Sequence, residues 1–194
     1  MDTAIRDLLT ELENWGRLND AENDDRSKKM LNLEPATAQL ISILIRTSQS
    51  KNILEIGTSN GYSTIWLAWA AQATDGHVTS IDMNPDKHIM ADKNLRRAGL
   101  RERVELKLGD ATEIIKALEG PFDCVFFDAD RSREPEQLKL LLPKLSSNAL
   151  VMADNVLSHP DQIAEYLETV ESLPNIEHMV VPVGKGLSLA FKID

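Results

Sequence analysis

A regular alternation of short apolar runs and longer amphipathic stretches, from residue 52 onward, constrains the fold of this chain more than any other feature. Stretches of helical length separate the runs, and this pattern is typical of a parallel sheet covered by helices on both faces. The sequence therefore predicts an α/β fold. The five apolar runs of strand length lie at residues 53–56, 77–82, 104–108, 122–128 and 149–153.

The last part of the chain breaks this alternation. Two strand-like runs, 176–183 and 187–193, are joined by Gly184-Lys185-Gly186 with no helix between them. Such a pair predicts an antiparallel hairpin. Added to the five earlier runs, it gives a seven-stranded, mostly parallel sheet with a C-terminal antiparallel hairpin.

Prolines and cap residues mark where several helices begin. Pro35 and Pro160 each open an amphipathic stretch, and proline is tolerated at the first helical position because its missing N–H has no partner there. Asn84 and Pro85 form a cap and first turn, and Gly99 ends the same helix. These positions place helices between the strand-like runs.

The N-terminal region has a different pattern. Residues 3–15 carry an apolar stripe at helical spacing, and Gly16 is expected to end that helix. Residues 17–29 are polar and lack apolar periodicity, which predicts a loop. We therefore expect an N-terminal helical appendage and linker over 1–31 and a main domain over 32–194.

The composition excludes several kinds of partner. Of 194 residues, 21 are Lys or Arg and 31 are Asp or Glu, so the net charge of −10 disfavours binding to nucleic acid and to anionic membrane surfaces. The N-terminus resembles no signal peptide and no run is long enough to span a bilayer. The single cysteine, Cys124, lies in an apolar run and suits a reducing compartment. We expect a cytoplasmic protein.

The first strand-to-helix turn contains two glycines, Gly57 and Gly61. A glycine lets a ligand approach the backbone, and the helix that follows offers free N–H groups and a positive dipole end. Asp82 ends the next strand, where an acid can accept hydrogen bonds from a ribose diol. The pattern indicates a nucleotide-like ligand and does not distinguish NAD from S-adenosylmethionine. The alternative is that these glycines serve turn geometry alone.

Three oxygen-bearing side chains follow two later strands. Asp128 ends one apolar run, and Asp154 with Asn155 ends the next. The carboxyl ends of parallel strands line a common crevice, so these side chains form an oxygen set suited to Mg²⁺ or a similar cation. The alternative is that they cap helices or form turns. The four histidines show no metal-ligand spacing.

Several stretches resemble class I S-adenosylmethionine-dependent O-methyltransferases of the cation-dependent group, which includes catechol and caffeoyl-coenzyme A O-methyltransferases. DAD followed by ADN is characteristic of this group. The resemblance implies a Rossmann-like fold, S-adenosylmethionine and a divalent cation as cofactors, a small phenolic, catechol-like acceptor, and often a homodimer. The matching stretches, in family order between residues 32 and 193, are LEIGTSNGYST, SIDMNPD, GDAT, FDCVFFDADR, ADNVL and PVGKGLSLAFK.

The same resemblance implies roles for individual residues. Asp128, Asp154 and Asn155 match the three protein ligands of the cation. Asp82 corresponds to the acid that holds the ribose hydroxyls, and Met83 to the residue against the adenine. The full set implied for the cofactor is Asn32, Leu33, Glu55, Gly57, Ser59, Gly61, Ser63, Asp82, Met83, Asp110, Ala111 and Asp128.

One candidate catalytic position departs from the family. Relatives have a lysine, taken as the general base, where this chain has Arg131. A guanidinium stays protonated in proteins and is a poor base, so Arg131 is expected to stabilise an oxyanion or bind an acidic group of the substrate. This departure leaves two alternatives open, a metal-independent small-molecule methyltransferase and a non-catalytic S-adenosylmethionine-binding protein. No acid/base pair suited to hydride transfer supports a NAD-dependent oxidoreductase.

Overall fold

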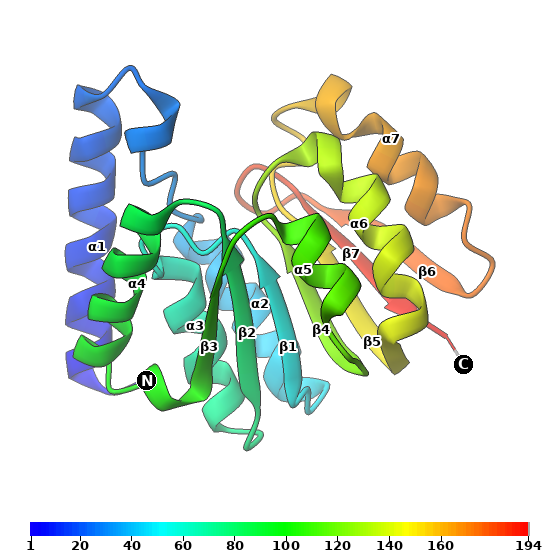
Figure 1. Ribbon diagram of the computed structural model, residues 1–194, viewed down its shortest axis with the longest axis horizontal. Coiled ribbons are helices and arrows are strands. Elements are labelled where there is room, and N and C mark those ends of the chain that lie inside the picture. Colours follow the sequence, from blue (N-terminus) through cyan, green and yellow to red (C-terminus); the bar gives the residue numbers. More distant parts are fainter. Residues whose placement is uncertain (194) are drawn as a thin grey trace.

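The computed structural model describes residues 1–193; residue 194, the last of the expected main domain, lies outside the described residues. Within 1–193 the chain forms one seven-stranded sheet with helices on both faces (Figure 1). The strands are β1 (Asn52–Ile56), β2 (His77–Asp82), β3 (Val104–Leu108), β4 (Phe122–Phe127), β5 (Leu145–Ala153), β6 (Ile176–Val181) and β7 (Leu187–Lys192).

The strand order is β3-β2-β1-β4-β5-β7-β6. The first five strands of this order are parallel, and β7 runs antiparallel to both β5 and β6. The predicted seven-stranded, mostly parallel sheet with a C-terminal hairpin is therefore confirmed. From β1 the chain first adds β2 and β3 on one side of the sheet and then crosses back to add β4 on the other side. Ligands of open α/β sheets bind in the crevice at such a reversal of strand order.

The two faces of the sheet are covered by different helices. In Figure 1, α5, α6 and α7 lie in front of the sheet and α2 and α3 behind it. Neighbouring residues of β1 divide between two cores, Ile53 packing on the α2–α3 side and Leu54 on the α5–α7 side. The helices are α1 (Thr3–Glu22), α2 (Pro35–Thr47), α3 (Tyr62–Gln72), α4 (Pro85–Arg97), α5 (Ala111–Ala117), α6 (Glu134–Leu141) and α7 (Pro160–Glu171).

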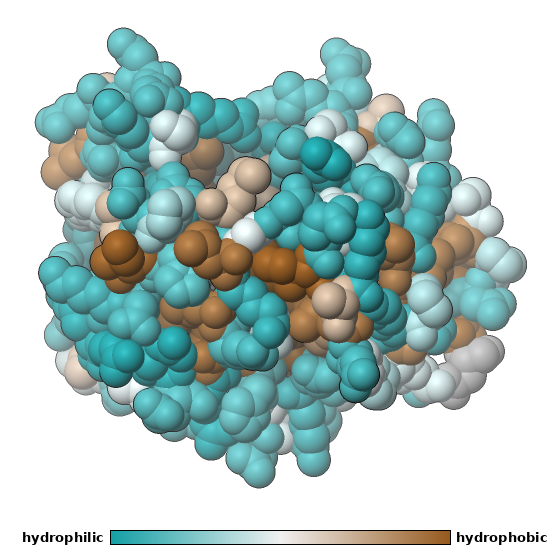
Figure 2. All heavy atoms as spheres, viewed as in Figure 1, coloured by the Kyte–Doolittle hydropathy of each residue, from teal (hydrophilic) through white to brown (hydrophobic). Residues whose placement is uncertain are grey.

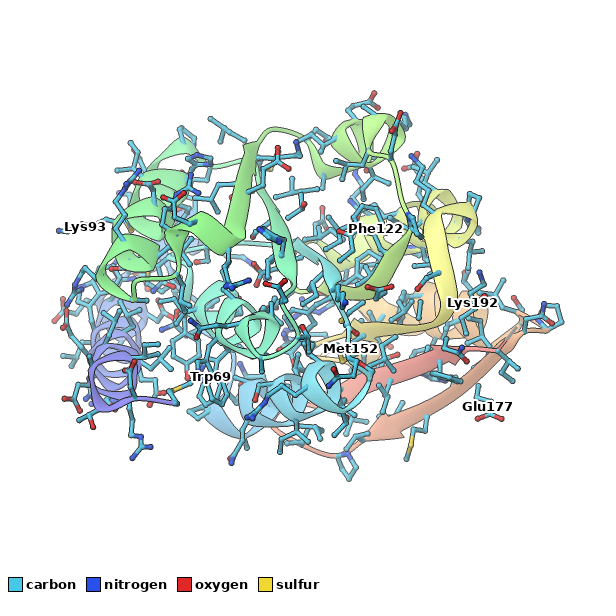
Figure 3. The ribbon with its side chains drawn as sticks, turned by 90° about the horizontal axis from the view of Figure 1, so that it is seen from below. Trp69, Lys93, Phe122, Met152, Glu177 and Lys192 are labelled. Carbon is cyan, nitrogen blue, oxygen red and sulfur yellow. The ribbon has the colours of Figure 1, made fainter. Side chains whose placement is uncertain are left out.

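Two views show which side chains lie inside the helix and sheet layers and which lie at the surface. In Figure 3, seen from below, Phe122 and Met152 lie inside the layers, whereas Lys93 and Glu177 lie at the periphery. Figure 2 shows mostly hydrophilic side chains on the face of Figure 1, with an apolar band across its middle and a notch at its upper edge. Within 1–193, no helix combines the length and hydropathy needed to cross a bilayer.

The first helix is longer than predicted. It continues through Gly16 to Glu22, so the expected end at Gly16 and the expected loop from residue 17 are wrong for those residues. The last turns of α1 lie largely in solvent and therefore need no apolar periodicity. Their polar composition was for this reason wrongly taken to indicate a loop. Trp15, expected on the apolar stripe, is 41% exposed, whereas Gly16 is buried against Asn32. The division of the chain at residue 31 stays a prediction.

Strand β5 also begins earlier than predicted, at Leu145 rather than at residue 149. The pairing register between β4 and β5 shifts between Phe122 and Cys124, and residues 146–148 of β5 are partly or fully exposed. Because the start of β5 is irregular and exposed, it contains no apolar run, and the sequence pattern therefore did not predict it. Cys124 is buried as expected, and burial raises the pKa of its thiol to about 12.

Candidate functional site

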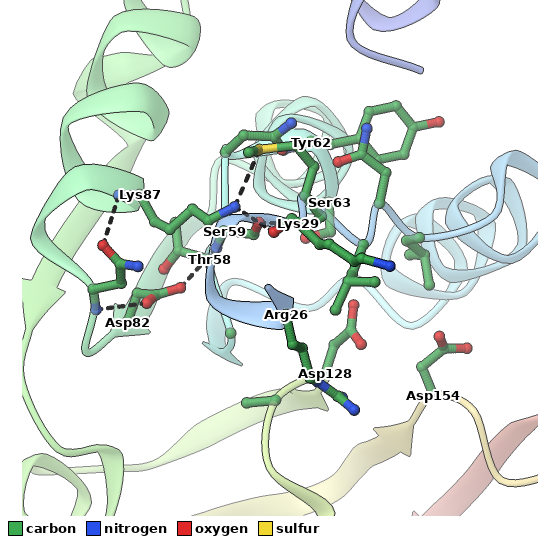
Figure 4. Close-up of a pocket in the computed structure, with 18 of the residues that line it drawn as sticks. Arg26, Lys29, Thr58, Ser59, Tyr62, Ser63, Asp82, Lys87, Asp128 and Asp154 are labelled. Atoms are coloured by element: carbon green, nitrogen blue, oxygen red, sulfur yellow. Dashed lines mark hydrogen bonds between the residues drawn. The ribbon is translucent and has the colours of Figure 1, made fainter. Parts of the chain in front are cut away.

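A cavity of about 690 Å³ lies at the carboxyl ends of β1, β2, β4 and β5 (Figure 4). Side chains from the loop between α1 and α2 and from the β6–β7 turn complete its walls. The structure therefore brings together most of the residues that sequence reasoning selected. Those that line the cavity are Asn32, Leu33, Gly57, Ser59, Ser63, Asp82, Met83, Asp128, Arg131, Asp154 and Asn155.

Four of the selected residues lie outside the cavity lining. Glu55 is fully buried in β1, Gly61 is the N-cap of α3, and Asp110 caps α5 through the backbone N–H of Glu113, with Ala111 as the first residue of that helix. Their assignment to the cofactor stays a prediction.

Backbone hydrogen bonds place the strand ends beside one another. The backbone N–H of Gly57 donates to the carbonyl of Ile81, and that of Asp128 donates to the carbonyl of Ile56. The N–H of Asp154 donates to Phe127 in the same way. Each bond extends the parallel ladder one residue beyond its strand, so the turns after β1, β4 and β5 start at one level.

Asp82 fixes the shape of the turn after β1. Its Oδ2 accepts a hydrogen bond of 2.8 Å from the backbone N–H of Ser59, and its Oδ1 accepts one of 2.9 Å from Asn84. The N–H of Tyr62, the first of α3, donates to the Oδ1 of Asn60 at 3.1 Å, which leaves the next N–H groups of the first turn, those of Ser63 and Thr64, near the cavity. This turn offers both a carboxylate and a positive helix end to a ligand.

The segment 29–33 closes one side of the cavity and is held from three directions. Asp20 of α1 accepts hydrogen bonds from the backbone N–H groups of Met30 (2.6 Å) and Leu31 (2.9 Å). The carbonyl of Met30 accepts a bond of 2.7 Å from Ser59, and Lys87 of α4 donates to the carbonyl of Lys29. The sequence predicted a role for neither Asp20 nor Lys87, because both contact segment 29–33 only after the chain has folded.

Asp20→Ala is expected to weaken binding of the cofactor that the resemblance implies, S-adenosylmethionine, about tenfold, because hydrogen bonds to a charged group contribute roughly 1.5–3 kcal/mol and two of them order the closing segment. Calorimetric titration with S-adenosylhomocysteine would measure the change. Asp7→Ala, an exposed acid on the same helix, is the control and should leave the affinity unchanged. Equal affinities in the two variants would contradict the role given to Asp20.

Two carboxylates from neighbouring strands share the opposite side of the cavity. Asp128 and Asp154 project into it from the ends of β4 and β5 (Figure 4). Burial and the charge of Asp154 raise the pKa of Asp128 well above its usual value; burial, followed by the charge of Glu34, raises that of Asp154 to about 6. Crowded carboxylates of this kind are stabilised by a cation.

The remaining contacts of this acid pair suit a cation. Asp154 is 3% exposed, and its Oδ1 is buried without a hydrogen-bond partner among residues 1–193. The Nδ2 of Asn155 donates to the Oδ2 of Asp154 at 2.6 Å, and a half-turn of that amide brings its oxygen to the same side. Among the described residues, no three His, Cys, Asp or Glu side chains form a metal-binding group.

Arg131 lines the cavity beside these acids. It lies in the short turn η3 (Arg131–Arg133), is 8% exposed, and its Nε has no hydrogen-bond partner within 1–193. Its Nη1 reaches only the Oε1 of Gln162, at 3.5 Å. Glu134, one turn further, is buried, and burial raises its pKa to about 8 although the charge of Arg131 opposes the shift.

Comparison with known proteins decides the family. A family model described as O-methyltransferase matches residues 16–193. The chain belongs to this O-methyltransferase family. Catechol O-methyltransferases of Niastella koreensis and Mycobacterium tuberculosis are similar to it, with 36% identity over 131 residues and 35% over 128 residues. Each alignment covers 66% of this chain but 59% and 58% of those relatives, so the match spans less than two thirds of their length.

Solved structures agree with this O-methyltransferase assignment. The O-methyltransferase of Bacillus cereus, in complex with SAH, has a TM-score of 0.81 at 25% identity, covering 99% of this chain and 91% of that chain. The O-methyltransferase TomG of Streptomyces achromogenes, in complex with SAM, has a TM-score of 0.81 at 26% identity, covering 100% and 91%. The likeness extends over the N-terminal helix as well as the sheet.

Glu55 is a buried acid beneath the cavity. Its carboxylate accepts hydrogen bonds from Ser63, Thr64 and Ser80, each at 2.5 Å. Burial outweighs these bonds and raises the pKa of Glu55 from 4.5 to about 7. The folded state therefore holds this proton at a pH where the unfolded chain has lost it.

Glu55 is expected to make the free energy of unfolding pH-dependent. The stabilisation is complete below pH 4.5 and is lost as the pH rises through about 7, a change of roughly 3 kcal/mol. Urea denaturation between pH 5 and 8 should show this slope in the wild type and a flatter one in Glu55→Gln. Equal slopes in both proteins would rule out Glu55 as the source.

Proposed function

We propose that the protein transfers the methyl group of S-adenosylmethionine to a hydroxyl of a small catechol-like acceptor, assisted by a divalent cation. One observation supports the cation: among residues 1–193, Asp154 Oδ1 is buried without a hydrogen-bond partner, next to Asp128, in the same cavity as the turn after β1. Relatives named catechol O-methyltransferase and a structural neighbour in complex with SAM support the reaction class.

The cofactor would lie on the β1–β2 side of the cavity. Asp82 would accept hydrogen bonds from its ribose hydroxyls, and Met83, which is 71% exposed, would cover the adenine. The free N–H groups of α3 would face the carboxylate of the methionine part. The segment 29–33 would exclude water from the sulfonium.

The cation would be held by Asp128, Asp154 and Asn155. When bound, it supplies a Lewis acid that lowers the pKa of a chelated phenol and fixes two adjacent oxygens. The chain would hold the acceptor so that one hydroxyl oxygen, after releasing its proton to solvent, faces the sulfonium methyl; the C–O bond would form as the C–S bond breaks, with S-adenosylhomocysteine as the leaving group. Alignment of this kind can lower a barrier by roughly 7–11 kcal/mol. Arg131 stays protonated, and its free Nε can donate to the phenolate oxygen.

A radiolabelled methyl-transfer assay against a panel of catechols and monophenols, with and without Mg²⁺, tests the proposal. We expect turnover of catechols only, lost in excess EDTA and restored by Mg²⁺. Full activity in EDTA would favour a metal-independent methyltransferase, which the arginine at position 131 also permits. Binding of S-adenosylmethionine without turnover of any acceptor would favour a non-catalytic binding protein. A homodimer rests on the resemblance alone, and a cytoplasmic location rests on the sequence of the N-terminus and the single cysteine, Cys124; both belong to the same proposal.

A further inference from the structure

Among the residues that the structure describes, His159 is the one of the four histidines that lines the cavity. It lies on the loop that joins β5 to α7, directly before the first residue of that helix. Arg131 lines the cavity as well, but a guanidinium is a poor base. Lys185, also in the lining, is held in an ion pair with Glu34 at 2.8 Å. Imidazole is the side chain best suited to accept a proton near neutral pH.

The backbone at His159 is fixed by the start of α7. Its carbonyl accepts hydrogen bonds from the N–H groups of Gln162 (3.0 Å) and Ile163 (3.3 Å). The Oε1 of Gln162 in turn lies 3.5 Å from Nη1 of Arg131. The first turn of α7 therefore connects the imidazole to the guanidinium that occupies the family's lysine position.

The hydrogen bonds of Ser158 determine which ring nitrogen of His159 is free. Ser158 Oγ lies 2.8 Å from Nδ1 of the imidazole and 3.1 Å from the carbonyl oxygen of Asn155. A carbonyl oxygen only accepts, so the single hydroxyl hydrogen of Ser158 goes to Asn155, and Nδ1 donates to Ser158. The Nε2 of His159 then keeps its lone pair, and no hydrogen bond within 1–193 engages that atom.

Three cations from three other segments act on the imidazole of His159. The charge of Arg131 lowers the pKa of the ring most, followed by partial burial and by the charges of Arg26 in η1 (Arg26–Lys28) and Lys185 in the β6–β7 turn. The ring is therefore uncharged at neutral pH and able to accept a proton. Because it is partly exposed, a proton that it accepts can pass to solvent.

We propose that His159 is the general base of the reaction, with Nε2 taking the proton of the acceptor hydroxyl that is methylated. This inference rests on the proposed function and gives the proton its route to solvent. The proton moves from the hydroxyl oxygen to Nε2, and the oxygen forms the C–O bond with the methyl carbon. The electron pair of the breaking C–S bond stays on sulfur, and the imidazolium then releases its proton to solvent.

Two acceptors that differ in acidity test this role. Catechol keeps its protons at pH 7.5, whereas the nitro group of 4-nitrocatechol leaves one hydroxyl largely ionised, so that acceptor needs no base. We expect His159→Gln to lower kcat about 100-fold for catechol, on the scale of general-base catalysis, and by about threefold at most for 4-nitrocatechol.

His77→Gln is the matched control for this substitution. His77 is exposed and begins β2, at the end of the strand away from the cavity, so the variant should keep both rates. Equal losses of kcat for the two acceptors in His159→Gln would show that the imidazole acts structurally, and unchanged rates would show that it does not act at all. Either result would overturn the inference and leave the proposed function standing.

Nitrogen NMR tests the same inference without turnover. Long-range ¹H–¹⁵N spectra of the protein at pH 7.5, with the ring of His159 assigned by its absence from His159→Gln, should show Nδ1 protonated and Nε2 unprotonated. Ser158→Ala removes the acceptor of the Nδ1 proton and should mix the two tautomers. A proton on Nε2 in the wild type would overturn the inference. The expected tautomer in a wild type that methylates neither acceptor would overturn the proposed function, and this inference with it.

Discussion

Asp154→Asn is expected to lower kcat/KM for a catechol about a thousandfold and, at the same time, to make the metal-free protein more stable. The loss of activity follows from removing one anionic ligand of a Lewis acid whose effect amounts to several kcal/mol. The gain in stability follows from burial, since Asp154 is 3% exposed, has an unpartnered oxygen and lies beside Asp128. Removing one of two crowded charges should add about 1–2 kcal/mol at pH 8.

Two measurements check both halves of this prediction. Urea denaturation in EDTA gives the stability, and thermal denaturation with added Mg²⁺ shows whether the cation stabilises the wild type and not the variant. Asp161→Asn is the matched control, because it removes the same charge from an exposed position in the first turn of α7. If Asp154→Asn kept wild-type activity and were stabilised by Mg²⁺ as much as the wild type, Asp154 would not be a ligand of the cation.

The central strands β1 and β4 could be predicted because nearly all of their residues are buried. β4 has four successive buried residues at its end, so it reads as a continuous apolar run, and Asp128 directly after it marks the strand end. Asp82 ends β2, a strand with both buried and exposed residues, and is recognised by its place at the strand end. The sequence thus predicts which acids meet at one edge of the sheet, although a strand pattern alone did not distinguish S-adenosylmethionine from NAD.

What the sequence could not predict depends on contacts between distant residues. Asp20 holds Met30 and Leu31 from across the end of α1, and Lys87 reaches Lys29 from 58 positions away. Arg131 stands in a polar stretch, yet it is buried because its turn packs against α7. Burial of a charged residue leaves no trace in local periodicity, so the buried guanidinium becomes visible only in three dimensions.

Gly57→Ala is expected to cost about 3 kcal/mol or more in the free energy of unfolding and to weaken cofactor binding at least a hundredfold. The φ of Gly57 is 106°, which an L residue rarely adopts, and a Cβ there would collide with the backbone carbonyl oxygen of Asp128. A backbone atom cannot move aside as a flexible side chain can. The turn after β1 would therefore separate from the end of β4, disturbing the cofactor side and the acid pair together.

Gly99→Ala separates this steric conflict from simple backbone strain. Gly99 follows α4 with a φ of 68°, and a Cβ built there meets nothing within 4 Å. It should therefore cost only about 1 kcal/mol, the ordinary penalty of a left-handed residue, and leave cofactor affinity unchanged. Urea denaturation and titration with S-adenosylhomocysteine compare the two variants. If Gly57→Ala cost no more than Gly99→Ala, the close approach of β1 and β4 would not be what requires glycine at this turn.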